Sequence, residues 1–314
     1  MIWLDWAITA TRFINFAAAI LLAAVAGFFL LANSFGYGRW RPEFFPFRLV
    51  LSLEVVAWLA QAMWLIELLC SVCGELGWDQ VGESEAFLGG TQFGKIGLWR
   101  CGLLLGLIAY RGFRFFGQKR SLATENWFRF KWLSAIETTI IFGQLALLAW
   151  FSHAAAGTGP WGWIQLGNDL LHLVGAALWP GGLVPLWWLL GRPVSEDVKR
   201  DALLRFSNVA VVVAPLVGAT GVLSAYFRMH DLAPLFTTDY GRYVLLKMGC
   251  FLLLIALGAV NRFRLIPALV NPSSEISETP ADWRKLRRNV LIEQSLFVVI
   301  LFAVARLGVL APPR

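Results

Sequence analysis

Residues 10–33 read ATRFINFAAAILLAAVAGFFLLAN, a run in which Arg12 is the one charged side chain. A helix that crosses the hydrocarbon core of a bilayer needs about 20 predominantly apolar residues, so this segment is long enough to span a membrane. Seven further segments meet the same requirement. The eight expected spans are 10–33, 48–72, 93–112, 131–152, 166–190, 206–228, 240–261 and 287–308. The sequence therefore predicts an all-α polytopic membrane bundle of eight transmembrane helices.

The composition of the whole chain agrees with a membrane protein. Of 314 residues, 58% are hydrophobic and 15% are charged, and there are 16 tryptophans and 24 phenylalanines. A soluble domain lacks the polar surface to cover so many apolar side chains. The formal net charge of +7 does not indicate nucleic acid, because the basic residues lie in short loops between apolar runs. We therefore expect contact with the lipid bilayer and no nucleic-acid partner.

The basic residues are concentrated in alternate loops. Residues 73–92 carry four acidic residues and no basic one, and residues 153–165 carry neither Lys nor Arg. Each of the other loops carries at least two basic residues, and these loops are 34–47, 113–130, 191–205 and 262–286. Basic loops are retained on the cytoplasmic side of a bacterial membrane. We therefore expect a multi-pass protein of the inner (plasma) membrane with both termini in the periplasm.

The two halves of the chain align with each other. The matched segments are Arg12–Asn15 with Asp169–His172, Arg48 with Arg205, Thr91–Lys95 with Thr238–Arg242, Arg100 with Lys247, and Glu137 with Glu293. Each half holds an even number of expected helices, so the repeats should run parallel. One integral membrane domain is thus expected to consist of two four-helix repeats, residues 1–152 and 153–314. Asn15 takes the place of His172, so only the second repeat carries this imidazole.

Several charged side chains fall inside the expected spans. They are Glu54, Glu67, Arg100, Glu137, Asp169, Lys247 and Glu293. A charge at the centre of a bilayer costs about 3 kcal/mol or more, so these groups should face the bundle interior and find partners. Their depth along the helices pairs Glu67 with Arg100 and Asp169 with Lys247. We favour pairs that tie helices together over a role in transport, which is the alternative.

All three histidines are expected at the periplasmic face. His153 ends the fourth span, His172 lies about two turns inside the fifth, and His230 follows Met229 after the sixth. Asp169 lies one turn from His172 on the same helix face, where its carboxylate can orient the imidazole or complete a metal site. Imidazole suits copper, zinc or iron. By spacing alone, a metal site and hydrogen bonds between helices are equally open alternatives.

Two cysteines form a second candidate group. Cys70 and Cys73 are one helical turn apart near the periplasmic end of the second span. In an oxidising periplasm they offer either a strained disulfide or soft ligands for Cu(I). We favour the simpler interpretation, in which both are small buried hydrophobic side chains.

A series of short motifs runs in order through residues 150–310. The motifs are Ser152-His153-Ala154-Ala155, Asp169-x-x-His172-Leu173, Trp179-Pro180-Gly181-Gly182-Leu183, Arg205-Phe206-Ser207, Thr220-Gly221, Thr238-Asp239-Tyr240-Gly241-Arg242 with Lys247, Asn261-Arg262 with Pro267, and Arg287-Arg288 with Glu293. In this order they resemble the copper-resistance D (CopD) family of inner-membrane proteins. The first half is less similar, and Asn15 stands there in place of an expected histidine.

The resemblance implies a membrane protein that handles copper and is not an enzyme. It implies copper uptake from the periplasm, for import and homeostasis. It favours His153 and His172 as copper ligands, and His230, Asp169 and Met229 are the further candidates. A small periplasmic copper carrier of the CopC type is the implied partner, supplied as a separate protein.

Two other functions remain as alternatives. Two imidazoles on neighbouring helices can ligate haem iron, as in a b-type redox protein. Here, however, His153 and His172 both lie near one face, and the chain holds no second pair. The other alternative is a copper sensor or assembly factor that binds the metal without moving it.

Overall fold

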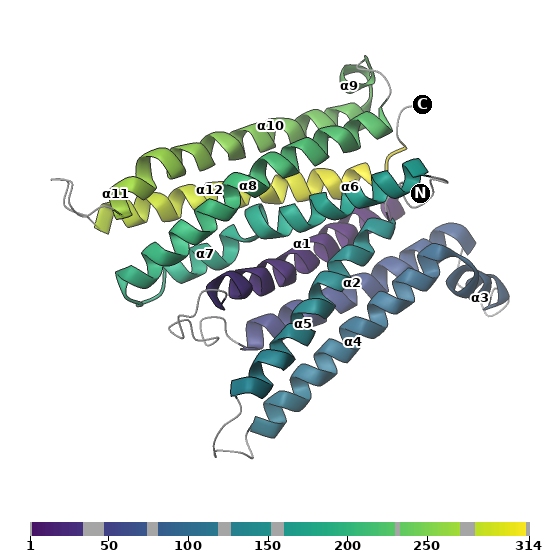
Figure 1. Ribbon diagram of the computed structural model, residues 1–314. Helices are drawn as coiled ribbons and strands as arrows, with labels where there is room; N and C mark the ends of the chain where they lie inside the picture. Colours follow the sequence, from purple (N-terminus) through teal and green to yellow (C-terminus); the bar gives the residue numbers. More distant parts are fainter. Residues whose placement is uncertain are drawn as a thin grey trace. The chain divides into compact units, whose positions relative to one another are not determined.

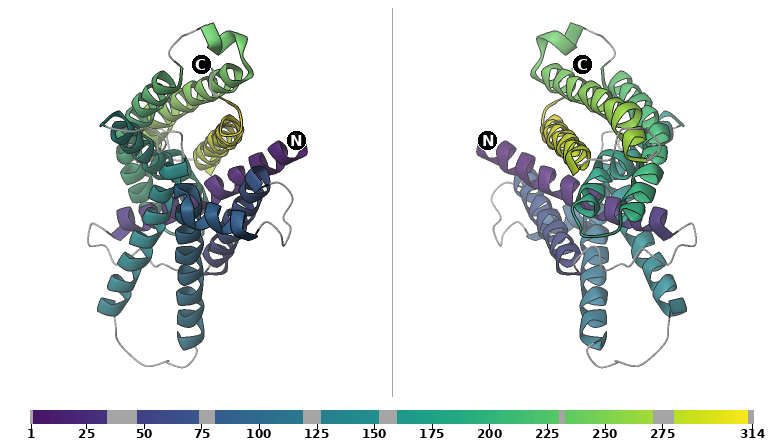
Figure 2. Two further views of the ribbon diagram at one scale, coloured as in Figure 1. Left: turned by 90° about the vertical axis from the view of Figure 1, so that its right-hand side faces the viewer. Right: turned by 90° about the vertical axis from the view of Figure 1, so that its left-hand side faces the viewer.

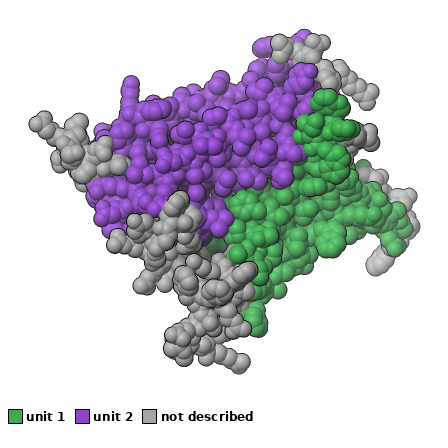
Figure 3. Space-filling model, viewed as in Figure 1, with its two compact units in different colours: residues 1–23, 45–166 green, residues 24–44, 167–314 purple. Residues whose placement is uncertain are grey.

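The structure is a computed structural model that describes residues 2–33, 47–73, 81–118, 127–151, 160–229, 233–270 and 280–311. All regular secondary structure in these residues is helical (Figure 1). The chain divides into two compact units (Figure 3). The first unit comprises residues 1–23 and 45–166, and the second comprises residues 24–44 and 167–314.

The helices of each unit follow the chain in order. The first unit holds most of α1 (Ile2–Asn33), followed by α2 (Phe47–Cys73), α3 (Val81–Gly90), α4 (Gln92–Gln118) and α5 (Trp127–Leu147), which continues as a 3₁₀ turn, Leu148–Phe151. The second unit holds most of α6 (Pro160–Ala176), then α7 (Leu183–Leu190), α8 (Glu196–Arg228), α9 (Ala233–Thr237), α10 (Asp239–Val260), α11 (Ile266–Val270) and α12 (Pro280–Leu307). Within the second unit, α10 and α12 lie side by side (Figures 1 and 2), and α2 packs on α4 within the first.

The described residues contain seven helical segments that are long and apolar enough to cross a membrane, one fewer than expected. The seven segments are Trp3–Leu31, Arg48–Ser71, Gln92–Phe113, Pro160–Leu190, Glu196–Arg228, Asp239–Leu269 and Asp282–Leu307. The expected fourth span, 131–152, corresponds to the shorter apolar stretch Ala135–Phe151. The chain is thus an all-α polytopic membrane protein whose described residues contain seven candidate transmembrane helices.

Two of these spans contain a wide π-helical turn. Ala177–Gly181 joins α6 to α7 and contains Pro180, which has no backbone N–H to donate to the preceding helical turn. Asn261–Leu265 joins α10 to α11, and the N–H of Ile266 donates to the carbonyl of Asn261 across five residues. The helical direction continues through both turns, so each pair of short helices acts as one span.

The starts of α4 and α10 have the same local structure. The Thr91 hydroxyl donates to the carbonyl of Phe87 at 2.7 Å and accepts from the N–H of Gly94 at 3.0 Å. Thr238 makes the equivalent bonds to Pro234 and Gly241, at 2.7 and 3.0 Å. In each case the threonine caps the start of a long helix, and its hydroxyl also bonds to the short helix that precedes it.

The position of the glycine in this turn explains its residue type. A Cβ atom on Gly94 would collide with the backbone of Leu88, and one on Gly241 would collide with the backbone of Leu235. At this position only glycine, which has no Cβ atom, allows the short helix to lie so close to the start of the long helix.

The buried charges of the first unit do not pair as their depth predicted. Glu67 accepts a hydrogen bond from the Thr11 hydroxyl, whereas Arg100 donates to the amide oxygens of Asn15 and Gln61. The prediction of a Glu67–Arg100 pair is therefore wrong. Depth alone does not define the direction in which a side chain leaves its helix, and Arg100 meets two amides at its own level.

Candidate functional site

A cluster of polar side chains joins α6 to α8 in the second unit. Nδ1 of His172 lies 2.9 Å from the Thr220 hydroxyl oxygen. The Asp169 carboxylate accepts hydrogen bonds from the Ser224 hydroxyl at 3.1 Å and from Nη2 of Arg228 at 2.9 Å. The three partners on α8 are spaced four residues apart and so share one helix face. That face holds two of the predicted site residues in defined orientations.

Asn168 adds a further bond between the same helices. Its side-chain nitrogen donates to the Ser224 hydroxyl at 2.7 Å and to the backbone carbonyl of Thr220 at 3.1 Å. Asn168 and Ser224 are both buried. Each bond links α6 to α8, so the positions of Asp169 and His172 are supported by a satisfied buried network.

The close packing of these helices depends on small residues opposite the cluster. A Cβ atom on Gly221 would come within 3.4 Å of Cε1 of His172. One turn away, Gly175 of α6 faces Val217 of α8. A Cβ atom at position 221 would meet the imidazole at van der Waals distance, so the ring packs close to the α8 backbone.

The cluster has more positive than negative charge. Lys247 of α10 interacts electrostatically with both Asp169 and Arg228, and the His172 ring interacts with both cations. Depth along the helices predicted that Asp169 pairs with Lys247. The Asp169 carboxylate instead forms its ion pair with Arg228, and it does not bond to His172. The partner of the His172 Nδ1 atom is Thr220 instead. One carboxylate thus faces two cations beside the ring.

Met229 directly follows this cluster and is used in packing. Its side chain is 7% exposed and forms a hydrophobic cluster with Tyr240 and Val244 of α10. Leu307 and Leu310 pack against the same cluster. The thioether therefore anchors the end of α8 to α10 and α12 next to the polar cluster.

The described residues supply only part of a copper site. No group of three or more His, Cys, Asp or Glu side chains within the described ranges comes together as a metal cluster. His172 offers one imidazole, and both oxygens of Asp169 already accept hydrogen bonds. His153 and His230, the other two predicted imidazoles, lie outside the described residues. A copper ion at His172 would need donors from those segments.

Three functional candidates were missed by the sequence analysis. Ser224 and Arg228 carry no motif of their own, and Thr220 belongs to a motif without an assigned role. Their spacing of four residues was the available signal, because it places a hydroxyl, a hydroxyl and a cation on one face of the expected sixth span. The opposing Asp169 and His172, three residues apart, form the complementary face.

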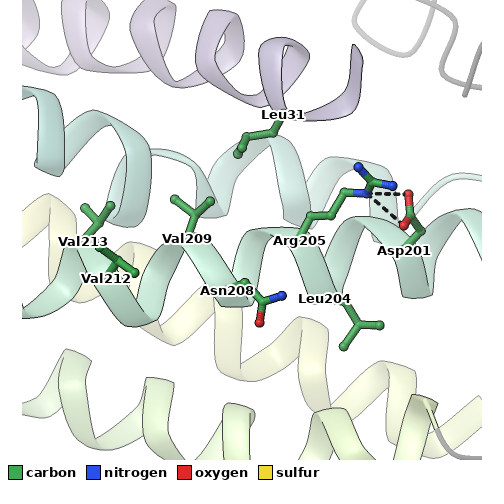
Figure 4. A pocket seen from close by; sticks show the side chains of 8 residues that line it. All are labelled: Leu31, Asp201, Leu204, Arg205, Asn208, Val209, Val212 and Val213. Atoms are coloured by element: carbon green, nitrogen blue, oxygen red, sulfur yellow. Dashed lines mark hydrogen bonds and ion pairs between the residues drawn. The ribbon is translucent and has the colours of Figure 1, made fainter. Parts of the chain in front are cut away.

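A cavity of about 680 Å³ lies elsewhere in the second unit (Figure 4). Its polar wall is formed by Arg205 and Asp201, whose carboxylate accepts from Nε of Arg205 at 2.8 Å. Apolar side chains form most of the remaining lining, among them Leu31, Leu204, Val209, Val212 and Val213. Among the described residues, no imidazole or sulfur lines this cavity, so its known lining differs from the His172 cluster.

Comparisons with known proteins agree with the residue motifs. The family model described as "Copper resistance protein D-like, N-terminal domain" matches residues 3–163, and the model described as "Copper resistance protein D" matches residues 200–307. The second match includes Thr220, Ser224, Arg228 and Lys247 of the polar cluster. Both halves of the chain are thus matched by family models.

Two relatives match almost the full length of the chain, and a third matches part of it. The chain is 28% identical to the inner membrane protein YebZ of Escherichia coli, over 96% of this chain and 97% of that protein. It is 26% identical to copper resistance protein D of Pseudomonas syringae pv. tomato, over 96% of each chain. A 123-residue stretch is 32% identical to the copper transport protein CutJ of Bacillus subtilis, covering 38% of this chain and 22% of CutJ. The chain therefore belongs to the copper resistance protein D (CopD) family of membrane proteins.

Proposed function

We propose that this protein binds copper at the periplasmic face of the bacterial inner membrane and passes it inward. The observation that carries the proposal is the orientation of His172 by Thr220 within the polar cluster of a chain that belongs to the CopD family. Two relatives named for copper resistance and copper transport support copper as the cargo. A relative named as an inner membrane protein supports the location.

His172 is the centre of the proposed copper site. Its Nδ1 atom is engaged with Thr220, so Nε2 is the nitrogen that we assign to copper. We propose His153 as the second ligand and His230 as a third, because imidazoles suit copper and all three are expected at one membrane face. Met229 is the soft alternative, although its side chain would first have to leave its hydrophobic cluster.

Asp169 contributes mainly through its charge in this proposal. It offsets part of the positive potential that Arg228 and Lys247 impose on His172. The remaining positive charge weakens the binding of a cation. A carrier that must release its ion benefits from such a moderate affinity, because an ion held too tightly is not passed on.

The architecture that we propose is two parallel four-helix repeats, residues 1–152 and 153–314. The matching turns at Thr91 and Thr238 support it. So do two hydrogen bonds at equivalent positions, from Thr11 to Glu67 and from Asn168 to Ser224, each between residues 56 apart. In this arrangement the stretch Ala135–Phe151 belongs to an eighth span, and both termini are periplasmic.

A periplasmic carrier of the CopC type is the proposed donor of copper. Ligand exchange between two proteins requires the receiving site to be accessible from the donor's compartment. A site between α6 and the C-terminal part of α8 meets this requirement in the proposed topology, in which the start of α6 and the end of α8 face the periplasm.

Copper counterflow in proteoliposomes tests this function. Vesicles that contain the wild-type protein and unlabelled copper should accumulate radioactive ⁶⁴Cu, and H172A should abolish the accumulation. The matched control is L171A, because Leu171 is the neighbouring residue on α6 and its side chain is 50% exposed. Copper binding without counterflow would reject transport and favour a sensor or assembly factor. A Soret absorbance band in the purified protein would favour haem.

A further inference from the structure

The first unit contains a buried cation without a carboxylate partner among the described residues. The Arg100 side chain is 1% exposed, and its guanidinium donates to the amide oxygens of Gln61 and Asn15. The guanidinium also lies over the ring of Phe151, 5.9 Å from the ring centroid. Amide oxygens carry only partial charge, so the full positive charge of Arg100 stays uncompensated in an apolar helix bundle.

A second arginine lies one helical turn from Asn15. The Arg12 guanidinium lies over the ring of Trp64, 4.9 Å from the centroid, and over that of Phe16 at 5.6 Å. These are cation–π contacts, and no acidic side chain pairs with Arg12 in the described part of the chain. The nearby carboxylate of Glu67 accepts the Thr11 hydroxyl instead.

The same region has buried hydrogen-bond donors that lack an acceptor within the described residues. They are Nε of Arg12, Nε1 of Trp58, Nε2 of Gln61, Nε1 of Trp64 and Nε of Arg100. The three residues from α2 are spaced three apart and therefore lie along one helix face. One buried acceptor, Oε1 of Gln144, is also without a partner. Five unpaired donors against this single acceptor indicate a missing group that only accepts.

We propose that Arg12, Gln61 and Arg100 bind a small inorganic anion of the halide class inside the first unit. The side-chain oxygens of Asn15 and Gln61 both accept hydrogen bonds from Arg100. The Gln61 oxygen also accepts from the Asn15 amide, so the unpaired side-chain atom of Gln61 is its nitrogen, which is a donor. The donors come from α1, α2 and α4, and a small spherical anion accepts from all three directions. Its single negative charge offsets part of the positive charge of the two arginines, which a neutral water molecule cannot do.

The anion site lies in the first half, at positions that correspond to those of the proposed copper site in the second half. In the alignment of the two halves, Asn15 corresponds to His172 and Arg100 corresponds to Lys247. The first half thus has two arginines and amides where the second has an imidazole, a lysine and a carboxylate. The anion site stands on the contacts of the first unit alone, so it is independent of copper transport.

Binding of radioactive ³⁶Cl⁻ to the purified full-length protein in detergent micelles tests the proposal. We expect saturable binding to the wild type that bromide displaces and gluconate, a large anion, does not. R100Q should weaken the affinity at least 10-fold. The control is K95Q, which removes one positive charge from an exposed position on the same helix and should leave binding unchanged.

A second variant, R12Q, keeps the proposal testable if R100Q does not fold. Arg12 makes only ring contacts among the described residues, so R12Q should fold and should also weaken chloride binding at least 10-fold. The proposal is overturned if the wild type retains no more ³⁶Cl⁻ than empty micelles do. It is equally overturned if R12Q binds chloride with the affinity of K95Q.

Discussion

Replacing Arg111 with leucine should strongly destabilise the first unit. Glu54 of α2 is 0% exposed, and its carboxylate accepts from Nε of Arg111 at 2.8 and 2.9 Å and pairs with Nη2 at 2.7 Å. Nη1 of the same arginine lies 3.7 Å from the carboxylate of Glu137. R111L therefore leaves one buried carboxylate without its cation and a second one nearby. Removing one partner of a buried ion pair costs about 3–5 kcal/mol.

The double variant R111L/E54L tests whether the loss of stability in R111L comes from the unpaired carboxylate of Glu54. Replacing both members of a buried pair by apolar residues is often neutral, so the double variant should lose only about 0–2 kcal/mol. The free energy of unfolding is measured by titrating SDS into detergent-solubilised protein and following helix content by circular dichroism. The difference between the variants gives the coupling energy between the two residues.

Two outcomes would refute this reasoning. If R111L loses less than about 1 kcal/mol, Glu54 is not held by Arg111 in a buried site. If the double variant loses as much as the two single changes combined, the residues are not coupled. Copper counterflow by the double variant then decides between the two roles considered for these charges. Retained counterflow assigns the pair to architecture, and its loss in a stable protein assigns it to transport.

Three further predictions concern the site, the packing and the topology. D169N should lower copper affinity about 10- to 100-fold, because it removes a negative charge about 6 Å from the His172 region at an effective dielectric constant near 20. Copper affinity is measured by titrating the purified protein with copper. An unchanged affinity would contradict the proposal that Asp169 acts through its charge. G241A should lower the free energy of unfolding in the SDS titration by about 1–3 kcal/mol, because the new Cβ atom clashes with neighbouring backbone. The control G102A should be neutral or slightly stabilising, because a Cβ atom at Gly102 meets no heavy atom within 4 Å. A phosphatase reporter fused within residues 113–130 should be inactive because the proposed topology places this loop in the cytoplasm, and an active reporter would reverse the orientation.

The spans were largely predictable because hydrophobic length is written directly into the sequence. Seven of the expected segments coincide with helices of membrane-spanning length, although several helices extend further. For example, α8 begins at Glu196, ten residues before the expected start of its span. The polar end of such a helix has no hydrophobic signal, so helical structure outside the bilayer core escapes a search for apolar runs.

The pairing of side chains was not predictable to the same degree. Depth along a helix follows from residue number, but the direction of a side chain depends on how each helix rotates against its neighbours. Asp169 was expected to pair with Lys247 and pairs with Arg228, because α8 presents that face to α6. His172 was expected either to bind a metal or to hydrogen-bond across helices, and its hydrogen-bond partner Thr220 required the three-dimensional structure. The copper ligands themselves remain a prediction.

The copper content of the purified protein tests the central claim most directly. We expect wild-type protein, loaded with copper and desalted, to retain about one copper ion per chain in mass-spectrometric metal analysis. H172A and H153A should each retain far less, whereas L171A should match the wild type. If both histidine variants keep the wild-type copper content, the site does not include these residues, and the Cys70/Cys73 pair becomes the next candidate.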